Sequence, residues 1–287
     1  MTTLINRIRP VFLSSGSGVP TGFFVGIVAL MVVVAIFAPW IAPYDPNAQN
    51  LLGRLKAPGT EARNVLYLLG SDELGRDLLS RLIYGARISL SVAFLSVVLS
   101  GCVGILLGML AGYRRGWVEI VIMRLVDVFL SVPAILLAII TVAVLGPGFV
   151  NVILVLALTR WPRYARLAYG QTLSVAGMPY VRLAHAMGAG WVRILRLHIL
   201  PNIIAPLSVI ATLEFGLMVL FEAGLSFLGL GVQPPTASWG AMLSVGRNYV
   251  SNAWWIATFP GLCLFMLVLS VNLIGDRLSE YLNPKSR

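Results

Sequence analysis

Acidic residues inside apolar stretches are the side chains of this sequence most suited to chemistry. Glu214 and Glu222 lie in one such stretch, and Asp127 lies in another. Around a helix the two glutamates are about 80° apart, so both can face the interior of a bundle. We expect both to line a pore, the alternative being a structural hydrogen bond or a pair with another subunit. For Asp127 we expect a local ion pair with Arg124, one helical turn earlier.

The patterns of common catalytic and metal sites are absent. The sequence holds no G-x-x-x-x-G-K-[ST] loop, no H-E-x-x-H and no C-x-x-C. The only histidines, His185 and His198, lie in a basic stretch and make a poor metal site. An intramembrane serine or aspartyl hydrolase would need a histidine base or a second aspartate inside an apolar stretch, but the predicted spans contain no histidine, and Asp127 is their only aspartate. We therefore expect no catalysis, and no metal or cofactor bound by this chain.

Composition places these residues in a membrane protein. Charged residues make up 11% of the chain and apolar residues 58%, whereas soluble domains contain about 25% charged residues. The formal net charge of +10 does not indicate nucleic acid, because the basic residues lie between apolar runs. Cys102 and Cys263 lie within apolar runs and are read as small buried hydrophobes without a disulfide.

Six apolar runs are each long enough, at about 20 residues, to cross a bilayer. The predicted spans are 21–41, 87–114, 120–144, 149–169, 201–230 and 250–275. The first is interpreted as an uncleaved anchor. The predicted fold is an all-α membrane protein. Its predicted parts are a cytoplasmic segment 1–20, the first helix 21–41, an extracytoplasmic loop 42–86, a five-helix core 87–275 and a cytoplasmic tail 276–287. The core contains the loop 170–200.

Basic residues predict the orientation. Most of the 21 Lys and Arg residues lie in the termini, in 112–124 and in 160–200, and the last of these carries no acid. Because Lys and Arg near membrane ends stay on the cytoplasmic side, both termini are predicted to be cytoplasmic.

In the second span, small residues recur every four positions, a pattern that lets helices pack closely in lipid: Ser96, Ser100, Gly104, Gly108 and Gly112.

The loop between the fourth and fifth spans is predicted to form two short helices. Pro179 suits a helix start, Gly188 or Gly190 a left-handed stop, and Pro201 the end of the second helix. On the first helix, Tyr180, Ala184 and Met187 share a face with Val181, whereas Arg182 and His185 point elsewhere; on the second, Ile194 and Leu197 oppose Arg193 and Arg196. The loop is either an amphipathic hairpin in the headgroup layer or a docking element for a cytoplasmic partner.

The same loop resembles that of the membrane permeases of binding-protein-dependent ABC importers. Their pattern is E-A-A, three residues, Gly, nine residues, I-x-L-P, which Ala184, Gly188 and Leu200-Pro201 match, whereas Arg182, Leu183 and His198 depart from it. Residues 180–189 are similar to Y-V-R-A-A-R-A-L-G-A of the dipeptide and oligopeptide branch. Further stretches of this branch are similar to 69–77, 80–87, 225–240, 254–261 and 272–276.

The resemblance implies a type I importer fold, a bacterial inner-membrane location and ATP-driven uptake of short peptides. The implied partners are a second homologous permease, two ATPase subunits that bind ATP and Mg, and an extracytoplasmic solute-binding protein. It implies that the ATPases contact a coupling helix made of Tyr180, Val181, Arg182, Ala184, His185, Met187 and Gly188. The pore that Glu214 and Glu222 are expected to line would then be the translocation path. Nickel chelates, glutathione and antimicrobial peptides are alternative cargoes. A self-sufficient secondary transporter is the alternative mechanism, although no duplicated halves are evident.

The outer loop 42–86 is expected to contain an interfacial helix. Ser71 can cap it, with Asp72 and Glu73 in the first turn, and Asp77 can pair with Arg81. This helix either seals the rim of the bundle or contacts the solute-binding protein. The candidate contact residues are Asp72, Arg76, Asp77 and Trp239. Trp254 and Trp255 are interpreted as anchors in the interfacial aromatic belt.

Overall fold

A computed structural model describes residues 21–282 of the chain, and most of these residues are helical. The predicted segment 1–20 and the end of the tail 276–287 lie outside the described residues. The helices in chain order are α2 (Thr21–Ile36), α3 (Ala38–Ile41), α4 (Leu78–Arg114), α5 (Gly116–Ser131), α6 (Ala134–Leu145), α7 (Phe149–Ala176), α8 (Pro179–Ala186), α9 (Trp191–Ile194), α10 (Leu200–Phe227), α11 (Trp239–Gly246) and α12 (Trp255–Leu282).

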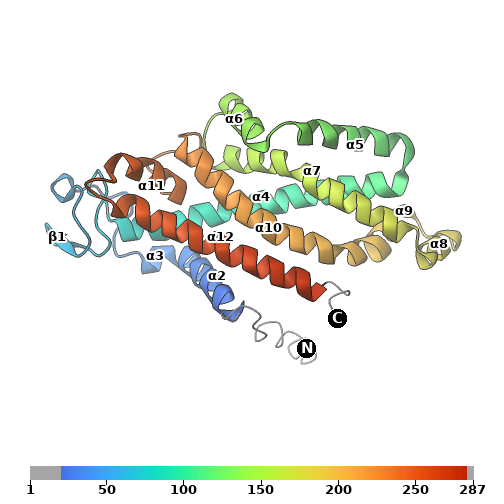
Figure 1. The fold of residues 1–287 in the computed structure, drawn as a ribbon, viewed down its shortest axis with the longest axis horizontal. Helices are drawn as coiled ribbons and strands as arrows, with labels where there is room; N and C mark the ends of the chain where they lie inside the picture. The colour runs from blue at the N-terminus through green and yellow to red at the C-terminus, as the bar shows by residue number, and fades with distance from the viewer. Residues whose placement is uncertain (1–20, 283–287) are drawn as a thin grey trace.

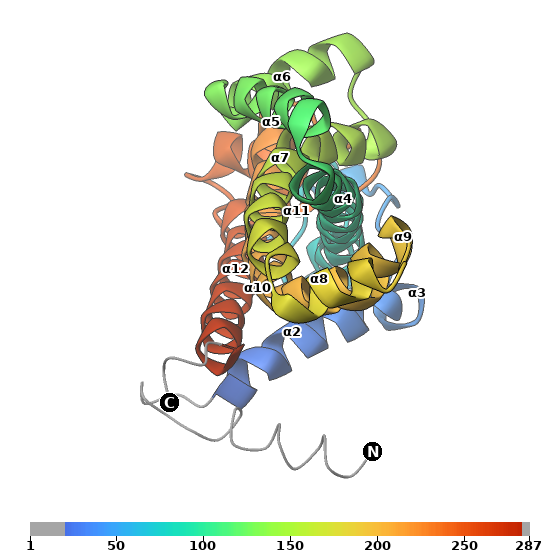
Figure 2. The ribbon, with the colours of Figure 1, turned by 90° about the vertical axis from the view of Figure 1, so that its right-hand side faces the viewer.

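Four long helices, α4, α7, α10 and α12, form an elongated bundle (Figure 1). A small antiparallel hairpin of β1 (Thr60–Ala62) and β2 (Val65–Tyr67) lies with α11 at one end of the bundle, and α8 lies at the other end. Seen along the bundle, α5 and α6 cover one side, and α2 packs against α4 and α12 on the opposite side (Figure 2). The two loops singled out in the sequence are therefore at opposite ends.

The row of small residues in α4 faces α7, which confirms its predicted packing role. A Cβ added at Gly104 would lie 2.4 Å from the carbonyl oxygen of Trp161, and one added at Gly108 would lie 2.3 Å from that of Ala165. Ser96, earlier in the row, is fully buried. The two backbones approach so closely that only residues without a larger side chain fit between them.

The third predicted span is broken, which corrects the single helix expected over 120–144. The helices α5 and α6 meet at an angle of 94°. Val132 and Pro133 separate them, with Val132 in an extended conformation. Proline disfavours a helical conformation in the residue before it and lacks the N–H that would continue the hydrogen-bond ladder, so the chain turns here.

By length and hydropathy, the described residues contain three helices able to cross a membrane, or four if the bent pair counts as one span: Leu78–Arg114, Trp191–Phe227, Trp255–Leu282 and the α5–α6 pair. The first predicted span is shorter than expected, because α2 has 16 residues. The helix α7 is not among the three, since every 18-residue stretch of it contains Arg160, Arg163 and Arg166. The arrangement of six spans therefore stays a prediction.

The second span begins earlier than predicted, and the interfacial helix expected from Ser71 does not form as a separate element. The N-cap of α4 is Asp77, whose Oδ2 accepts hydrogen bonds from the Ser80 backbone N–H at 2.8 Å and from the Ser80 hydroxyl at 2.7 Å. Ser71 instead lies in a loop, where its backbone bridges to that of Asp77. The cap belongs to Asp77 because its carboxylate satisfies the free N–H groups of the first helical turn.

The cysteines are both free in the structure. Cys263 is partly buried, whereas Cys102 is exposed on the surface of α4, which corrects the expectation that both are buried. Cys102 lies within the apolar part of α4, where the surroundings of an exposed side chain are expected to be lipid.

Candidate functional site

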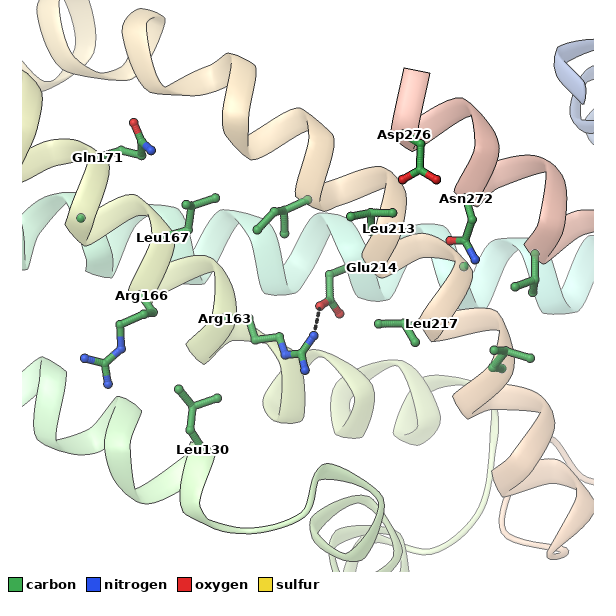
Figure 3. A pocket seen from close by; sticks show the side chains of 15 residues that line it. Leu130, Arg163, Arg166, Leu167, Gln171, Leu213, Glu214, Leu217, Asn272 and Asp276 are labelled. Atoms are coloured by element: carbon green, nitrogen blue, oxygen red, sulfur yellow. Dashed lines mark hydrogen bonds and ion pairs between the residues drawn. The ribbon is translucent and has the colours of Figure 1, made fainter. Parts of the chain in front are cut away.

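A cavity of about 910 Å³ opens between α5, α7, α10 and α12 (Figure 3). Its polar wall residues include Arg163 and Arg166 of α7, Glu214 of α10, and Asn272 and Asp276 of α12. Apolar side chains complete the wall, among them Leu130, Leu167, Leu213 and Leu217. A concave, mostly apolar site with a few charged groups is the usual form of a ligand site.

Glu214 lies inside the bundle, at the centre of an ion-pair cluster with two arginines of α7 that was not predicted from the sequence. Its Oε1 is 3.1 Å from Nη1 of Arg163, and its Oε2 is 3.7 Å from Nη1 of Arg160. Arg160 is buried and also stacks on the ring of Phe221, with its guanidinium carbon 4.1 Å from the ring centre. The two cations stabilise the buried carboxylate, which would be costly alone.

Asp127 pairs with Arg166 of α7, and not with Arg124 as predicted. Helical spacing does place Arg124 within reach of Asp127, but α5 packs along α7, so a cation on the neighbouring helix competes for the carboxylate. Both side chains of the pair are about half exposed. The pair joins α5 to the cavity wall.

Glu222 has a different environment from Glu214, although both lie on α10. Its side chain is fully buried, its Oε2 accepts a hydrogen bond from Ser89 of α4 at 2.9 Å, and its Oε1 accepts one from Ser226 at 2.8 Å. These contacts match the structural alternative considered for this residue. Glu222 is not among the residues lining the cavity, so its role in a translocation path stays a prediction.

The loop between α7 and α10 forms the predicted first helix, α8, which begins at Pro179 and is followed by Gly188 at a φ of 85°. Val181 is buried, Ala184 is partly buried, and the other predicted coupling residues are exposed: Tyr180, Arg182, His185, Met187 and Gly188. Val181 therefore seats α8 on the bundle. Tyr180 and Met187, which were predicted to share a face with Val181, are exposed on the surface of this chain.

The second helix of the loop does not end at Pro201, which corrects the prediction. The helix α9 continues through a turn of π-helix at Leu195–Ile199 into α10, and Pro201 lies in the first turn of α10. Proline lacks the N–H that would continue the hydrogen-bond ladder, and the turn of π-helix directly before Pro201 is where the spacing of that ladder changes. The expected apolar face is also only partly buried, since Ile194 is buried but Leu197 is exposed.

The surface beside α8 is basic. Arg114 stacks on Trp191, with 4.8 Å from its guanidinium carbon to the ring centre. Arg115, Arg182 and His185 line a hollow of about 380 Å³ between the ends of α4 and α7 and the helix α8. This concentration of positive charge is consistent with the predicted cytoplasmic position of the loop.

The four candidate contact residues, three of the outer loop and Trp239 of α11, are all buried within the chain. Asp72, Arg76, Asp77 and Trp239 are each at most 6% exposed. Arg76 Nε lies 2.6 Å from Asp72, and Arg81 also pairs with Asp72, at 3.4 Å, and not with Asp77 as predicted. The carboxylate of Asp77 instead accepts the capping hydrogen bonds at the start of α4, and burial raises its pKa.

Hydrogen bonds from two tryptophans also hold this end of the bundle together. The indole N–H of Trp239 donates to the carbonyl oxygen of Leu82 at 3.0 Å, and that of Trp255 donates to the carbonyl oxygen of Ser71 at 3.1 Å. Trp255 is therefore buried inside the subunit, which corrects its interpretation as a belt anchor, whereas Trp254 is half exposed. Direct contact of the four candidate residues with a solute-binding protein stays a prediction.

Comparison with known protein families gives two matches along this chain. Residues 23–58 match the N-terminal transmembrane domain of oligopeptide transport permease C. Residues 104–287, more than half of the sequence, match the inner membrane component of binding-protein-dependent transport systems. This chain belongs to that permease family.

Relatives of this permease include a di/tripeptide transport system permease of Pseudomonas aeruginosa, 48% identical over 89% of this chain and 85% of the relative. A dipeptide transport system permease of Escherichia coli is 46% identical over 92% of this chain and 89% of the relative. A probable D,D-dipeptide transport system permease of Escherichia coli is 40% identical over 99% and 93% of the two chains.

Solved structures support the fold of the permease. An inward-facing structure of the MetNI methionine ABC transporter matches with a TM-score of 0.58 and 22% identity, over 72% of this chain and 98% of the other. An amino acid ABC transporter matches with a TM-score of 0.52 and 16% identity, over 69% and 92%. The mostly helical fold of an ABC importer permease is thus shown.

Sequence reasoning missed four cavity residues of the permease, Arg163, Arg166, Asn272 and Asp276, and also Arg160, the buried partner of Glu214. A signal was present, because the three arginines follow one another at every third position within an otherwise apolar helix. We interpreted them as topology markers at the end of a span. Within residues 21–282, the permease brings no three His, Cys, Asp or Glu side chains together as a metal site.

Proposed function

We propose that this permease is the subunit of an ATP-driven ABC importer that moves dipeptides and other short peptides across the bacterial inner membrane. The observation that carries this proposal is the 48% identity to a di/tripeptide permease over 89% of the chain. The charged cavity between α5, α7, α10 and α12 supports it, since a peptide has charged ends and needs charged groups to replace water.

The proposed assembly contains a second homologous permease, two ATPase subunits and an extracytoplasmic solute-binding protein. ATP and Mg bind the ATPase subunits, and this chain binds neither. The proposed topology has six spans, and α2 and α7 are among them. An even number of spans places both termini on the same side of the membrane, and this side, which also holds α8, is proposed to be the cytoplasm. The position of α8 and the β1–β2 hairpin at opposite ends of the bundle supports this orientation.

Coupling to the ATPases is proposed to pass through α8. Closure of the ATPases moves α8, and α8 moves the bundle by rigid contact, so the cavity is exposed to one side of the membrane and then to the other. The burial of Val181 and the exposure of Tyr180, Arg182, His185 and Met187 support this role, because one side of α8 is fixed and the other is free for a partner.

The test is uptake by the complex isolated from native membranes through a tag on this chain. The complex is reconstituted in proteoliposomes with its solute-binding protein, and uptake of labelled alanyl-alanine, glutathione and a nickel chelate is measured with and without ATP. We expect ATP-dependent uptake of the dipeptide. Uptake of only glutathione or the chelate would replace the proposed substrate, and uptake by this chain alone without ATP would favour a secondary transporter.

The proposed orientation predicts the labelling of single cysteines in a background with Cys102 and Cys263 changed to alanine. In intact spheroplasts, N47C is expected to react with a membrane-impermeant maleimide, whereas R182C is expected to react only after the membrane is opened. Asn47 and Arg182 are both exposed in the structure, so burial does not explain a difference between them. The reverse labelling pattern would invert the topology.

A further inference from the structure

The charges around the cavity do not cancel locally. Arg166 is paired with Asp127, whereas the single carboxylate of Glu214 is shared by the guanidinium groups of Arg160 and Arg163. This Glu214 cluster therefore carries one formal positive charge in excess. The side chain of Asp276, on α12, is exposed and makes no ion pair or hydrogen bond within the part of the chain that the structure describes. The cavity thus has one uncompensated charge of each sign.

Arg163 and Glu214 of the Glu214 cluster both line the cavity, but only Arg163 is substantially exposed. Its side chain is 54% exposed, whereas those of Arg160 and Glu214 are 5% and 3% exposed. Oε2 of Glu214 and Nε of Arg160 are buried and lack hydrogen-bond partners. If Arg163 turns toward a ligand, Glu214 can therefore keep Arg160 as its partner, and no unpaired carboxylate is left in the bundle.

The two uncompensated charges lie on different helices. In Figure 3, Glu214 lies between Arg163 of α7 and the side chains of Asn272 and Asp276 of α12. The volume of about 910 Å³ falls within the range of about 300–1,000 Å³ that is usual for small-molecule sites. Leucine side chains from α7 and α10 supply apolar wall between the charges. Such a cavity is complementary to a small molecule with an anionic end, a cationic end and an apolar middle.

We propose that the cavity holds the transported peptide by its two charged ends, with the terminal carboxylate bound by Arg163 and the terminal ammonium bound by Asp276. This assignment rests on the proposed function. A zwitterionic peptide brings one charge of each sign, which matches the two uncompensated charges. A guanidinium group binds a carboxylate through two parallel hydrogen bonds, so Arg163 exchanges Glu214 for the carboxylate of the peptide. Release of the peptide restores the pair with Glu214.

The test compares Arg163→Gln with Arg166→Gln in the reconstituted complex. Both arginines line the cavity, lie one turn apart on α7 and are about half exposed, but only Arg166 has a carboxylate of its own. We expect Arg163→Gln to lower the maximal rate of alanyl-alanine uptake at least about tenfold, because a hydrogen bond to a charged group is lost. Arg166→Gln is expected to lower the rate less than about threefold.

Further readouts separate peptide binding from a structural role. The concentration of loaded solute-binding protein that gives half-maximal uptake should not change in Arg163→Gln, since the cavity acts after docking. Thermal stability and recovery of the ATPase subunits should equal those of Arg166→Gln. Arg163→Lys, which keeps the charge, should retain more activity than Arg163→Gln. Asp276→Asn should lower uptake more than Asp127→Asn, its matched control.

Equal uptake by Arg163→Gln and Arg166→Gln would overturn the assignment of the carboxylate to Arg163. A loss of uptake that is matched by loss of assembly in Arg163→Gln, but not in Arg163→Lys or Asp276→Asn, would assign Arg163 a structural role instead. Absence of dipeptide uptake by the parental complex would contradict the proposed function itself. Because parental uptake is measured first, the two failures are distinguishable.

Discussion

Gly188→Val is expected to abolish peptide uptake while the permease still reaches the membrane. Gly188 follows α8 with a φ of 85°, a left-handed conformation. A β-branched residue resists this conformation at a cost of about 1–3 kcal/mol, so the chain after α8 must change direction to relieve the strain. Since α8 is the proposed contact of the ATPases, the measurements are uptake and the amount of ATPase subunit recovered with the tagged permease.

Gly190→Val is the matched control for this prediction. Gly190 lies in the same loop with an ordinary φ of −64°, and a Cβ at either glycine would meet no atom within 4 Å. The two variants carry the same side chain and differ in backbone strain, so Gly190→Val should transport like the parent. Ala184→Trp adds bulk on α8 without strain and should also lower ATPase recovery, because overpacking a fitted contact is costly. Parental uptake in both Gly188→Val and Ala184→Trp would remove the coupling role of α8.

Glu214→Leu is expected to cause the largest loss of stability among changes in the cavity. The substitution leaves Arg160, which is 5% exposed, without its carboxylate. Removing one partner of a buried ion pair costs about 3–5 kcal/mol, because the other charge remains buried and unpaired. The expected result is a permease that no longer survives mild heating in detergent, measured as the monodisperse fraction by size-exclusion chromatography.

A second change should restore the stability lost in Glu214→Leu. In the double variant Arg160→Leu/Glu214→Leu no buried charge is left unpaired, and such replacements are often neutral or stabilising. Asp127→Leu is the control, since its partner Arg166 is about half exposed and can be solvated, so the loss should be smaller. If Glu214→Leu is as stable as Asp127→Leu, the Glu214 cluster does not hold the bundle together.

Local patterns of the sequence were sufficient for the membrane class, the family and several elements. The low charge content and long apolar runs require a lipid environment, because such surfaces cannot all be buried in a chain of this length. Small residues at every fourth position identified the face of α4 that meets α7, and Pro179 and Gly188 marked the ends of α8. Each of these signals lies within a few helical turns, where spacing along the chain determines position in space.

Tertiary structure decided which partner each charged group takes. Glu222 bonds to Ser89, 133 positions away, and Asp127 takes Arg166 of another helix in place of the nearby Arg124. Glu214 and Glu222, similar in sequence context, have different surroundings, since Glu214 lines the cavity whereas Glu222 is bonded to serines away from it. Helical periodicity gives the direction of a side chain but not the helix that will lie opposite it. The energy of a buried charge depends on that neighbour, so the surroundings of these acids were decided only by the packing of the helices.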